Sequence, residues 1–238
     1  MIEVKGLEKR FGKLEVLKNI SFNVEPGKIT AIVGPNGSGK TTIIKSVLGL
    51  VKPNNGDILI NSKSVLGEYL YRKDIGYMPQ SASFPENLTV REVIKMICDL
   101  RNLNIEPNPK LIDALNLSPE MNKQIKNLSG GNKQKVSAVI SLMFNPSIII
   151  LDEPTAGLDP VVSNNLKEII IDERKNNKSI ILTSHIMSEI EELADHIIFL
   201  IDGKIKFDGS VLSLLTYKGE SKLEKAIANL MKEKSAWN

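Results

Sequence analysis

The residues best suited to chemistry form a glycine-rich run, Gly34-Pro-Asn-Gly-Ser-Gly-Lys40-Thr41, directly after the apolar residues 31–33. This order predicts a buried strand, a tight turn and a helix that starts near Gly39. The glycines allow backbone N–H groups to approach phosphate oxygens, and the positive end of the helix faces the same anion. Lys40 adds a mobile cation, and the Thr41 hydroxyl suits a magnesium ion that accompanies a nucleotide. The run therefore predicts a nucleotide phosphate site rather than a chance glycine-rich turn.

A second segment, residues 147–153, supports this prediction. Its apolar part, 147–151, has no alternation and is typical of a buried parallel strand, and it ends in Asp152-Glu153. Ligands in such sheets lie at the carboxyl ends of the strands. Asp152 is therefore a candidate magnesium partner, and Glu153 is a candidate to polarise a water molecule for attack on the terminal phosphate.

Three further polar positions follow predicted strands or precede a predicted helix. Gln80 follows the predicted strand end at residues 76–79, and His185 follows the predicted buried strand at 179–184. Alone, a glutamine or histidine is usually structural, but two of them at strand ends of a phosphate-binding sheet are candidates for the same cleft. Residues 128–132, Leu-Ser-Gly-Gly-Asn, stand before a helical stretch and indicate another anion site at a helix start.

Taken together, these motifs resemble the ATP-binding subunit of an ABC transporter, most of all the single-domain subunits of export systems. The resemblance runs from about residue 2 to about residue 215. Several independent motifs occur in the family's order: the phosphate loop, the glutamine loop at Gln80, the signature motif at 128–132, the strand ending in Glu153, the D-loop at 156–159 and the switch histidine His185. Asn132 departs from the usual glutamine, and Phe11 stands where the family more often has tyrosine.

The resemblance implies the following roles. ATP and Mg²⁺ are the implied cofactors, and Ser129 and Gly131 contact the ATP bound on the opposing subunit. The implied catalytic residues are Glu153, His185 and Gln80. The implied magnesium ligands are Thr41, Gln80 and Asp152. The implied nucleotide contacts are Phe11, Gly34, Pro35, Asn36, Gly37, Ser38, Gly39, Lys40, Thr41, Thr42, Ser129, Gly130 and Gly131. Phe11 would stack on adenine, with a core position in the first hairpin as the alternative.

The expected fold class is α/β: a P-loop NTPase core with a mostly parallel sheet, an N-terminal antiparallel β subdomain and an inserted helical subdomain. We expect an ATPase domain over residues 1–217, with its core in 1–80 and 146–217 and the helical subdomain in 81–145. A helical tail, 218–238, would follow, with its mixed charges on a solvated face.

The composition disfavours several other classes of protein. The 238 residues, 42% of them hydrophobic, can fill a sizeable core, and the net charge of +3 names no partner. Lysine and arginine are spread along the chain, so we expect no nucleic-acid partner. The single cysteine, Cys98, lies on an apolar helix face and reads as a buried thiol, in keeping with a reducing compartment. We see no signal peptide and no run of about 20 apolar residues that could cross a bilayer.

These features lead to three functional hypotheses. The favoured one is an ATPase that acts as a head-to-tail dimer on a separate transmembrane permease, at the cytoplasmic face of the membrane. Its cargo is open, with export and metalloenzyme maturation as the closest analogies and import not excluded. The second is a soluble ATPase of DNA repair or the ribosome, which needs a long coiled coil or a second phosphate loop. The third is a non-enzymatic nucleotide-binding scaffold, which Glu153 and His185 disfavour. Phe84 is either an exposed anchor for the permease or a core residue.

Overall fold

The structure, a computed structural model, describes residues 1–233. They fall into two compact units, which are described separately. Unit 1 is formed by Met1–Arg72 together with the segment from Ser179 onward, and unit 2 by Lys73–Lys178. Residues 234–238 of the predicted tail lie outside the described residues. Within residues 1–233, no helix is long and apolar enough to cross a membrane.

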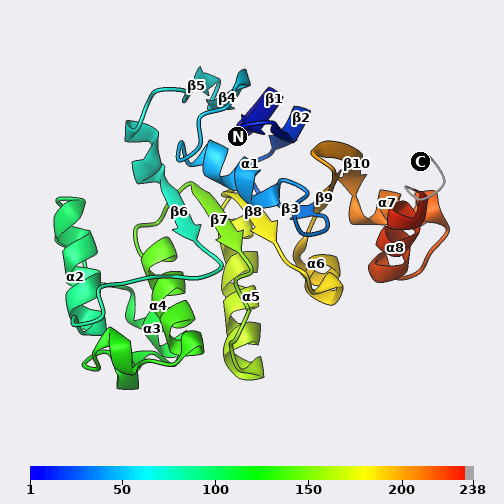
Figure 1. Cartoon of the computed structure of the whole chain (residues 1–238). Helices are drawn as coiled ribbons and strands as arrows, with labels where there is room; N and C mark the ends of the chain where they lie inside the picture. Colours follow the sequence, from blue (N-terminus) through cyan, green and yellow to red (C-terminus); the bar gives the residue numbers. More distant parts are fainter. Residues whose placement is uncertain (234–238) are drawn as a thin grey trace. The chain divides into compact units, whose positions relative to one another are not determined.

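Unit 1 begins with an antiparallel sheet (Figure 1). Its strands are β1 (Ile2–Phe11), β2 (Leu14–Val24), β4 (Asn55–Ile60) and β5 (Lys63–Ser64), in the order β2-β1-β4-β5. Along β1, Ile2, Val4 and Leu7 are buried while the other residues of the strand are half-buried or exposed, as expected for a sheet with one face on a core. This sheet is the predicted N-terminal antiparallel β subdomain.

The second sheet of unit 1 carries the phosphate loop. Strand β3 (Lys28–Val33) lies between β8 (Ser179–Thr183) and β9 (His196–Ile201) and is parallel to both. Strand β10 (Lys204–Ser210) pairs antiparallel with β9. Every residue of β8 and all but the first of β3 are buried, which explains why both strands are rich in aliphatic residues and lack a polar–apolar alternation.

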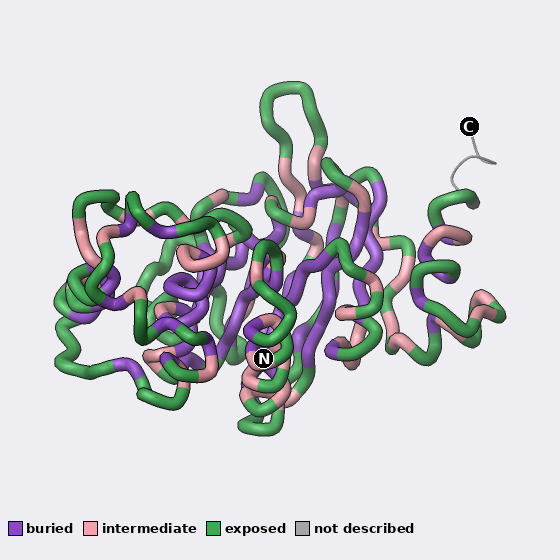
Figure 2. The backbone as a smooth tube through the Cα atoms, turned by 90° about the horizontal axis from the view of Figure 1, so that it is seen from below, coloured by how far each residue is buried: buried purple, intermediate pink, exposed green. Residues whose placement is uncertain are grey.

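Four helices complete unit 1: α1 (Lys40–Val47), α6 (Met187–Leu193), α7 (Val211–Lys218) and α8 (Leu223–Glu233). Helix α8 has a buried face made of Leu223, Ala226, Ile227 and Leu230, and these pack in one cluster with Ala31 and Val33 of β3, Phe199 of β9 and Ile190 of α6. Near the C-terminal label of Figure 2, α8 accordingly alternates between buried and exposed positions. The sequence prediction of a charged, solvated tail did not include this buried face.

Unit 2 contains a parallel strand pair and four helices: β6 (Ile75–Met78), β7 (Ile148–Asp152), α2 (Val90–Leu100), α3 (Pro109–Ala114), α4 (Gly130–Leu142) and α5 (Pro160–Lys175). Short 3₁₀ turns cover Ser118–Glu120 and Ile125–Asn127, and a third, Leu70–Asp74, spans the boundary in the chain between the two units. Helix α4 lies so close to β6 that a Cβ atom on Gly76 would stand 2.0 Å from the carbonyl oxygen of Ser141. The mixture of parallel and antiparallel strands with helices confirms the predicted α/β class.

Cys98 is a buried free thiol on α2, as predicted. Its Sγ donates to the carbonyl oxygen of Ile105 at 3.4 Å. Burial raises the pKa of the thiol, which disfavours the reactive thiolate.

The buried face of α8 yields a stability prediction. Leu223 is fully buried at the start of α8, whereas Leu212 on α7 is 74% exposed. Leu223→Ala should lower the free energy of unfolding by about 2–4 kcal/mol through lost burial and a cavity, whereas Leu212→Ala should change it by less than about 0.5 kcal/mol. Urea unfolding of the two variants provides the measurement. Equal midpoints for both variants would mean that α8 does not contribute to the core.

Candidate nucleotide site

The phosphate loop has the geometry of an anion cradle. Gly34, at the end of β3, approaches β9 so closely that a Cβ atom there would lie 2.2 Å from the carbonyl oxygen of Leu200. Gly39 is the N-cap of α1 with φ 111°, and its Cβ would lie 2.7 Å from Leu17 Cδ2. Only glycine fits these two positions. The loop therefore turns tightly enough to leave the first N–H groups of α1 facing outward, where an anion can accept from them.

Lysine and serine side chains complete the cradle. Lys40 Nζ donates to the carbonyl oxygens of Gly34 at 2.7 Å and Pro35 at 3.1 Å, so its ammonium group lies over the loop. Ser38 is buried, and among the described residues its Oγ has no hydrogen-bond partner. A buried polar atom of this kind needs a partner, and a phosphate or its hydration shell would supply one. Thr41 is exposed in the first turn of α1 and Thr42 is half-buried.

His185 lies beside this cradle. It is exposed two residues after the end of β8, and the turn that holds it is fixed by hydrogen bonds from Ile186 N to Ser184 Oγ, 3.0 Å, and from Ser184 Oγ to Glu189 Oε2, 3.1 Å. A pocket of about 180 Å³ is lined jointly by Gly34, Pro35, Asn36 and His185 and, from α8, by Ile227 and Met231. The structure thus brings the predicted switch histidine and phosphate loop together within unit 1. Sequence reasoning missed the two α8 residues.

Phe11 belongs to the surface and not to the core. It is the last residue of β1, it is 50% exposed, and Lys9 Nζ lies 4.9 Å from its ring centroid. Half of the side chain is accessible although Lys9 lies over the ring, and this exposure favours a stacking role over the alternative of a core residue of the first hairpin.

Unit 2 carries the other predicted residues. The register of β6 and β7 pairs Met78 with Leu151, so the two parallel strands end at the same edge. Gln80 follows β6 there and is exposed, whereas Asp152 is the last residue of β7 and is buried. Burial and, secondarily, the Asp152 carboxylate raise the pKa of Tyr77. Glu153 comes next and is half-buried.

The backbone of Glu153 adopts a left-handed conformation with φ 56°. Such a conformation costs roughly 1–2 kcal/mol for a residue with a Cβ atom. The carbonyl oxygen of Glu153 accepts hydrogen bonds from Ala156 N, 3.2 Å, and from Gln134 Nε2, 3.2 Å. The structure thus holds this candidate base in a costly backbone conformation, as is common at functional sites.

The signature segment starts helix α4. Ser129 is the N-cap, and its Oγ accepts from Asn132 N at 3.2 Å. Ser129 and Gly130 are exposed, and Gly131 is half-buried. The helix is 13 residues long, so its exposed N-terminus can offer N–H groups and a positive dipole end to an anion.

Each predicted magnesium ligand offers an oxygen donor. Thr41 in unit 1 and Gln80 and Asp152 in unit 2 offer hydroxyl, amide and carboxylate oxygens, the ligand type that Mg²⁺ prefers. Within residues 1–233, no three histidine, cysteine, aspartate or glutamate side chains gather in a way that could hold a metal by themselves. The predicted site relies instead on a hydroxyl, an amide and one carboxylate, together with phosphate oxygens.

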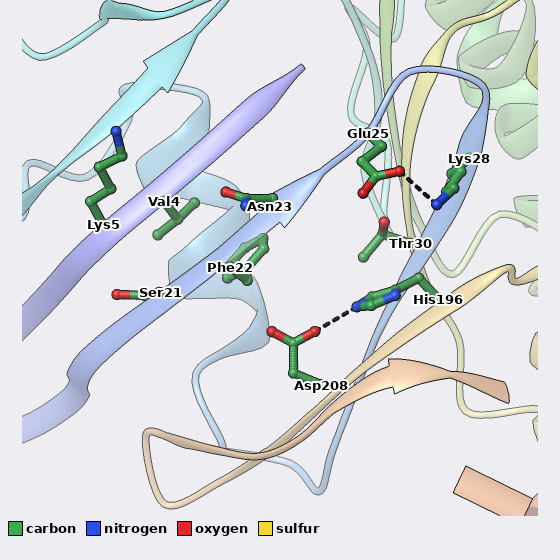
Figure 3. A pocket seen from close by; sticks show the side chains of 10 residues that line it. All are labelled: Val4, Lys5, Ser21, Phe22, Asn23, Glu25, Lys28, Thr30, His196 and Asp208. Carbon is green, nitrogen blue, oxygen red and sulfur yellow. Dashed lines mark hydrogen bonds and ion pairs between the residues drawn. The ribbon is translucent and has the colours of Figure 1, made fainter. Parts of the chain in front are cut away.

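A different pocket of unit 1 is drawn in Figure 3 and has about 390 Å³. Four of its charged groups form two pairs: His196 Nε2 lies 2.5 Å from Asp208 Oδ1, and Lys28 Nζ lies 2.6 Å from Glu25 Oε2. None of the residues that line it is a predicted site residue. We therefore place the candidate site at the phosphate loop and not in this pocket.

Comparisons with known proteins agree with the motifs. Residues 17–156 match the ABC transporter family. The chain is 35% identical over 214 residues to the lantibiotic transport ATP-binding protein SrtF of Streptococcus pyogenes, covering 88% of this chain and 93% of that protein. It is also 32% identical over 219 residues to the ABC-type transporter ATP-binding protein EcsA of Bacillus subtilis, covering 90% of this chain and 89% of that protein.

Solved structures share the fold. The ATP-binding subunit of an ABC transporter superposes with a TM-score of 0.91 at 28% identity, covering 97% of this chain and 99% of that one. This likeness confirms the predicted fold class, a P-loop NTPase core with an antiparallel β subdomain and an inserted helical part.

The cradle yields a binding prediction. Lys40→Ala should weaken ATP binding about 10- to 100-fold, because it removes a cation whose charge-assisted contacts contribute about 1.5–3 kcal/mol. Lys45→Ala is the control, since Lys45 is exposed in the last turn of the same helix. Titration with a fluorescent ATP analogue measures both affinities. Wild-type affinity in Lys40→Ala would remove the phosphate site from this loop.

Proposed function

Because this chain belongs to the ABC transporter family, we propose that it drives a separate transmembrane permease by binding ATP between two copies of itself and hydrolysing it. The chain is an ATP-binding subunit and an ATPase. The observation that carries the proposal is the glycine-only cradle at the end of β3, with the Lys40 ammonium group over it. The proposed functional division is an ATPase domain over 1–217, with its core in 1–80 and 146–217 and a helical subdomain in 81–145, and a tail over 218–238.

Each proposed residue performs one part of hydrolysis. The backbone of the phosphate loop and Lys40 bind the β- and γ-phosphates, and Phe11 stacks on adenine. Glu153 accepts a proton from a water molecule while the oxygen of that water attacks the γ-phosphorus. The bond from that phosphorus to the bridging oxygen breaks, and ADP and phosphate leave. His185 and Gln80 orient the terminal phosphate and the water.

Magnesium, when bound, neutralises charge on the β- and γ-phosphate oxygens. In this proposal Thr41, Gln80 and Asp152 are the residues that hold it. Asp152 is buried at the end of β7, and a cation stabilises the charge of a buried carboxylate.

Two copies work head to tail. Ser129, Gly130 and Gly131 of one copy contact the ATP held by the phosphate loop of the other, so each of the two sites is shared. The exposed N-terminus of α4 supports this arrangement, because it offers an anion site in addition to the phosphate loop of unit 1. A cassette of the same fold, 24% identical with a TM-score of 0.77, has been solved as a dimer in a post-hydrolysis state with ADP and phosphate.

The permease is a separate polypeptide, and the chain acts at the cytoplasmic face of the membrane. The relative that is named for lantibiotic transport favours export over metalloenzyme maturation as the work performed. The alternative of a soluble ATPase in DNA repair is disfavoured, because residues 81–145 are too few for a long coiled-coil insert. The relatives named for transport favour the transporter role over a role on the ribosome.

Glu153→Gln tests the proposed chemistry. The variant should bind ATP normally and lose turnover by a factor of about 10² to 10⁴, the usual contribution of a general base. It should also accumulate as an ATP-bound dimer in light scattering. Glu168→Gln, an exposed position on α5, is the control and should retain activity. Phosphate release by Glu153→Gln at the wild-type rate would refute the role of the base.

Phe84 provides the test of the partner. It is half-buried in the loop between β6 and α2, so neither the exposed anchor nor the core position describes it fully. Phe84→Asp should retain ATP-driven dimerisation but reduce co-purification with the permease at least about tenfold, because it puts a charge into an apolar contact. Phe84→Leu is the matched control and should retain most of the complex. Full recovery of the permease with Phe84→Asp would exclude this docking site.

A further inference from the structure

Two buried polar residues of α4 have no part in the proposed chemistry. Gln134 and Lys135 follow the signature segment by one helical turn, and they are only 5% and 7% exposed. Burial of an amide and an ammonium group is unfavourable unless each has a partner. Their partners identify what these residues do.

Both side chains contact the loop formed by residues 153–159, which we call the 153–159 loop. Gln134 Nε2 donates to the carbonyl oxygen of Glu153 at 3.2 Å. Lys135 Nζ lies 3.8 Å from Asp159 Oδ2. Asp159 is itself the N-cap of α5 and accepts from Val162 N at 3.0 Å. The start of α4 therefore holds both ends of the loop.

A third contact lies between these two. A Cβ atom on Gly131 would stand 2.4 Å from the carbonyl oxygen of Gly157. The backbone of the signature segment is thus in close packing with the middle of the 153–159 loop. Because the packing leaves no slack, a shift of the first turn of α4 must move the loop as well.

The contact at Glu153 is the one with a chemical consequence. With φ 56°, Glu153 holds a backbone conformation that a residue with a Cβ atom adopts only when its surroundings enforce it. Its carbonyl oxygen is fixed by the Gln134 amide and by Ala156 N. Since the peptide orientation at Glu153 sets the direction of its side chain, the Gln134 amide controls where the carboxylate points.

We propose that Gln134 and Lys135 are positioning residues that transmit engagement of the signature segment, Ser129–Gly131, to Glu153 of the same subunit. The inference rests on the proposed roles of Glu153 as the base and of Ser129–Gly131 as the contact to the partner's ATP. A shift of the signature segment on contact with the ATP of the other copy then reaches the base of its own copy, which couples the two sites through α4.

Gln134→Met is the decisive variant, because methionine keeps the length and most of the packing but removes the amide donor. The value of kcat should fall about 10- to 100-fold, as expected when a catalytic group is displaced by about 1 Å, whereas KM and ATP affinity should stay within about twofold of wild type. Lys135→Met should also lower kcat, and Lys135→Arg should retain most of it. Wild-type kcat in Gln134→Met would overturn the inference.

A double-mutant cycle separates positioning from general destabilisation. In a Glu153→Gln background, single-turnover hydrolysis should show no further loss on adding Gln134→Met, because the group that Gln134 positions has already been removed. The same double variant should still form the ATP-dependent dimer in light scattering. A loss that multiplies in this background would mean that Gln134 acts through the fold and not through Glu153.

Ser141→Ala is the matched control. Ser141 is a buried polar residue of the same helix, but its Oγ donates to the carbonyl oxygen of Ala138 and not to the 153–159 loop. The Ser141→Ala variant should have a lower melting temperature than the wild type but the same kcat. If Glu153→Gln keeps its turnover, the proposed base fails. If Glu153→Gln is inactive and Gln134→Met is fully active, only the positioning inference fails.

Discussion

The candidate site depends on one constraint, which is that a phosphate chain is bound best by donors that need no rearrangement. Backbone N–H groups supply this best, but they can converge on an anion only where no Cβ atom intervenes. Gly34 satisfies the requirement by lying against Leu200 of β9, and Gly39 by lying against Leu17 of β2. The loop therefore owes its shape to strand packing on both sides, and β3 lies between its parallel neighbours β8 and β9 so that this shape is held rigidly.

The same logic explains why the polar residues stand at strand ends. Buried parallel strands can present functional side chains to a ligand only at their ends, since both faces of the sheet are covered. His185 follows β8 in unit 1, whereas in unit 2 Gln80 follows β6 and Asp152 is the last residue of β7. Helix α8 adds a further wall, because Ile227 and Met231 line the pocket beside the phosphate loop and His185. Part of the chain beyond the matched family region, 17–156, thus borders the candidate site.

What the sequence could predict follows from how local each signal is. The phosphate loop, the strand runs and the N-cap at Ser129 are encoded within a few consecutive residues, so they were predictable. The buried face of α8 was also encoded, as apolar residues at 223, 226, 227 and 230 with helical spacing. It was not predicted, because charged residues lie between these positions and make the segment polar on average. The burial of Gln134 and Lys135 was not predictable, because it depends on Glu153 and Asp159, about 20 residues further along the chain. Local patterns do not report such contacts.

The contact between Lys135 and Asp159 is better explained by orientation than by stability. Asp159 is largely exposed, with 54% of its side chain accessible, and such pairs contribute little to the free energy of unfolding. The hydrogen bond from Val162 N lowers the pKa of the Asp159 carboxyl, with a smaller contribution from the charge of Lys135. A lowered pKa in the folded state means that the stabilisation is present above the unfolded pKa and is lost only as the pH falls through the folded value. The carboxylate therefore remains ionised at neutral pH, where it caps α5 and faces Lys135 at the same time. One side chain thereby joins the helix that starts with the signature segment to the helix that follows the candidate base.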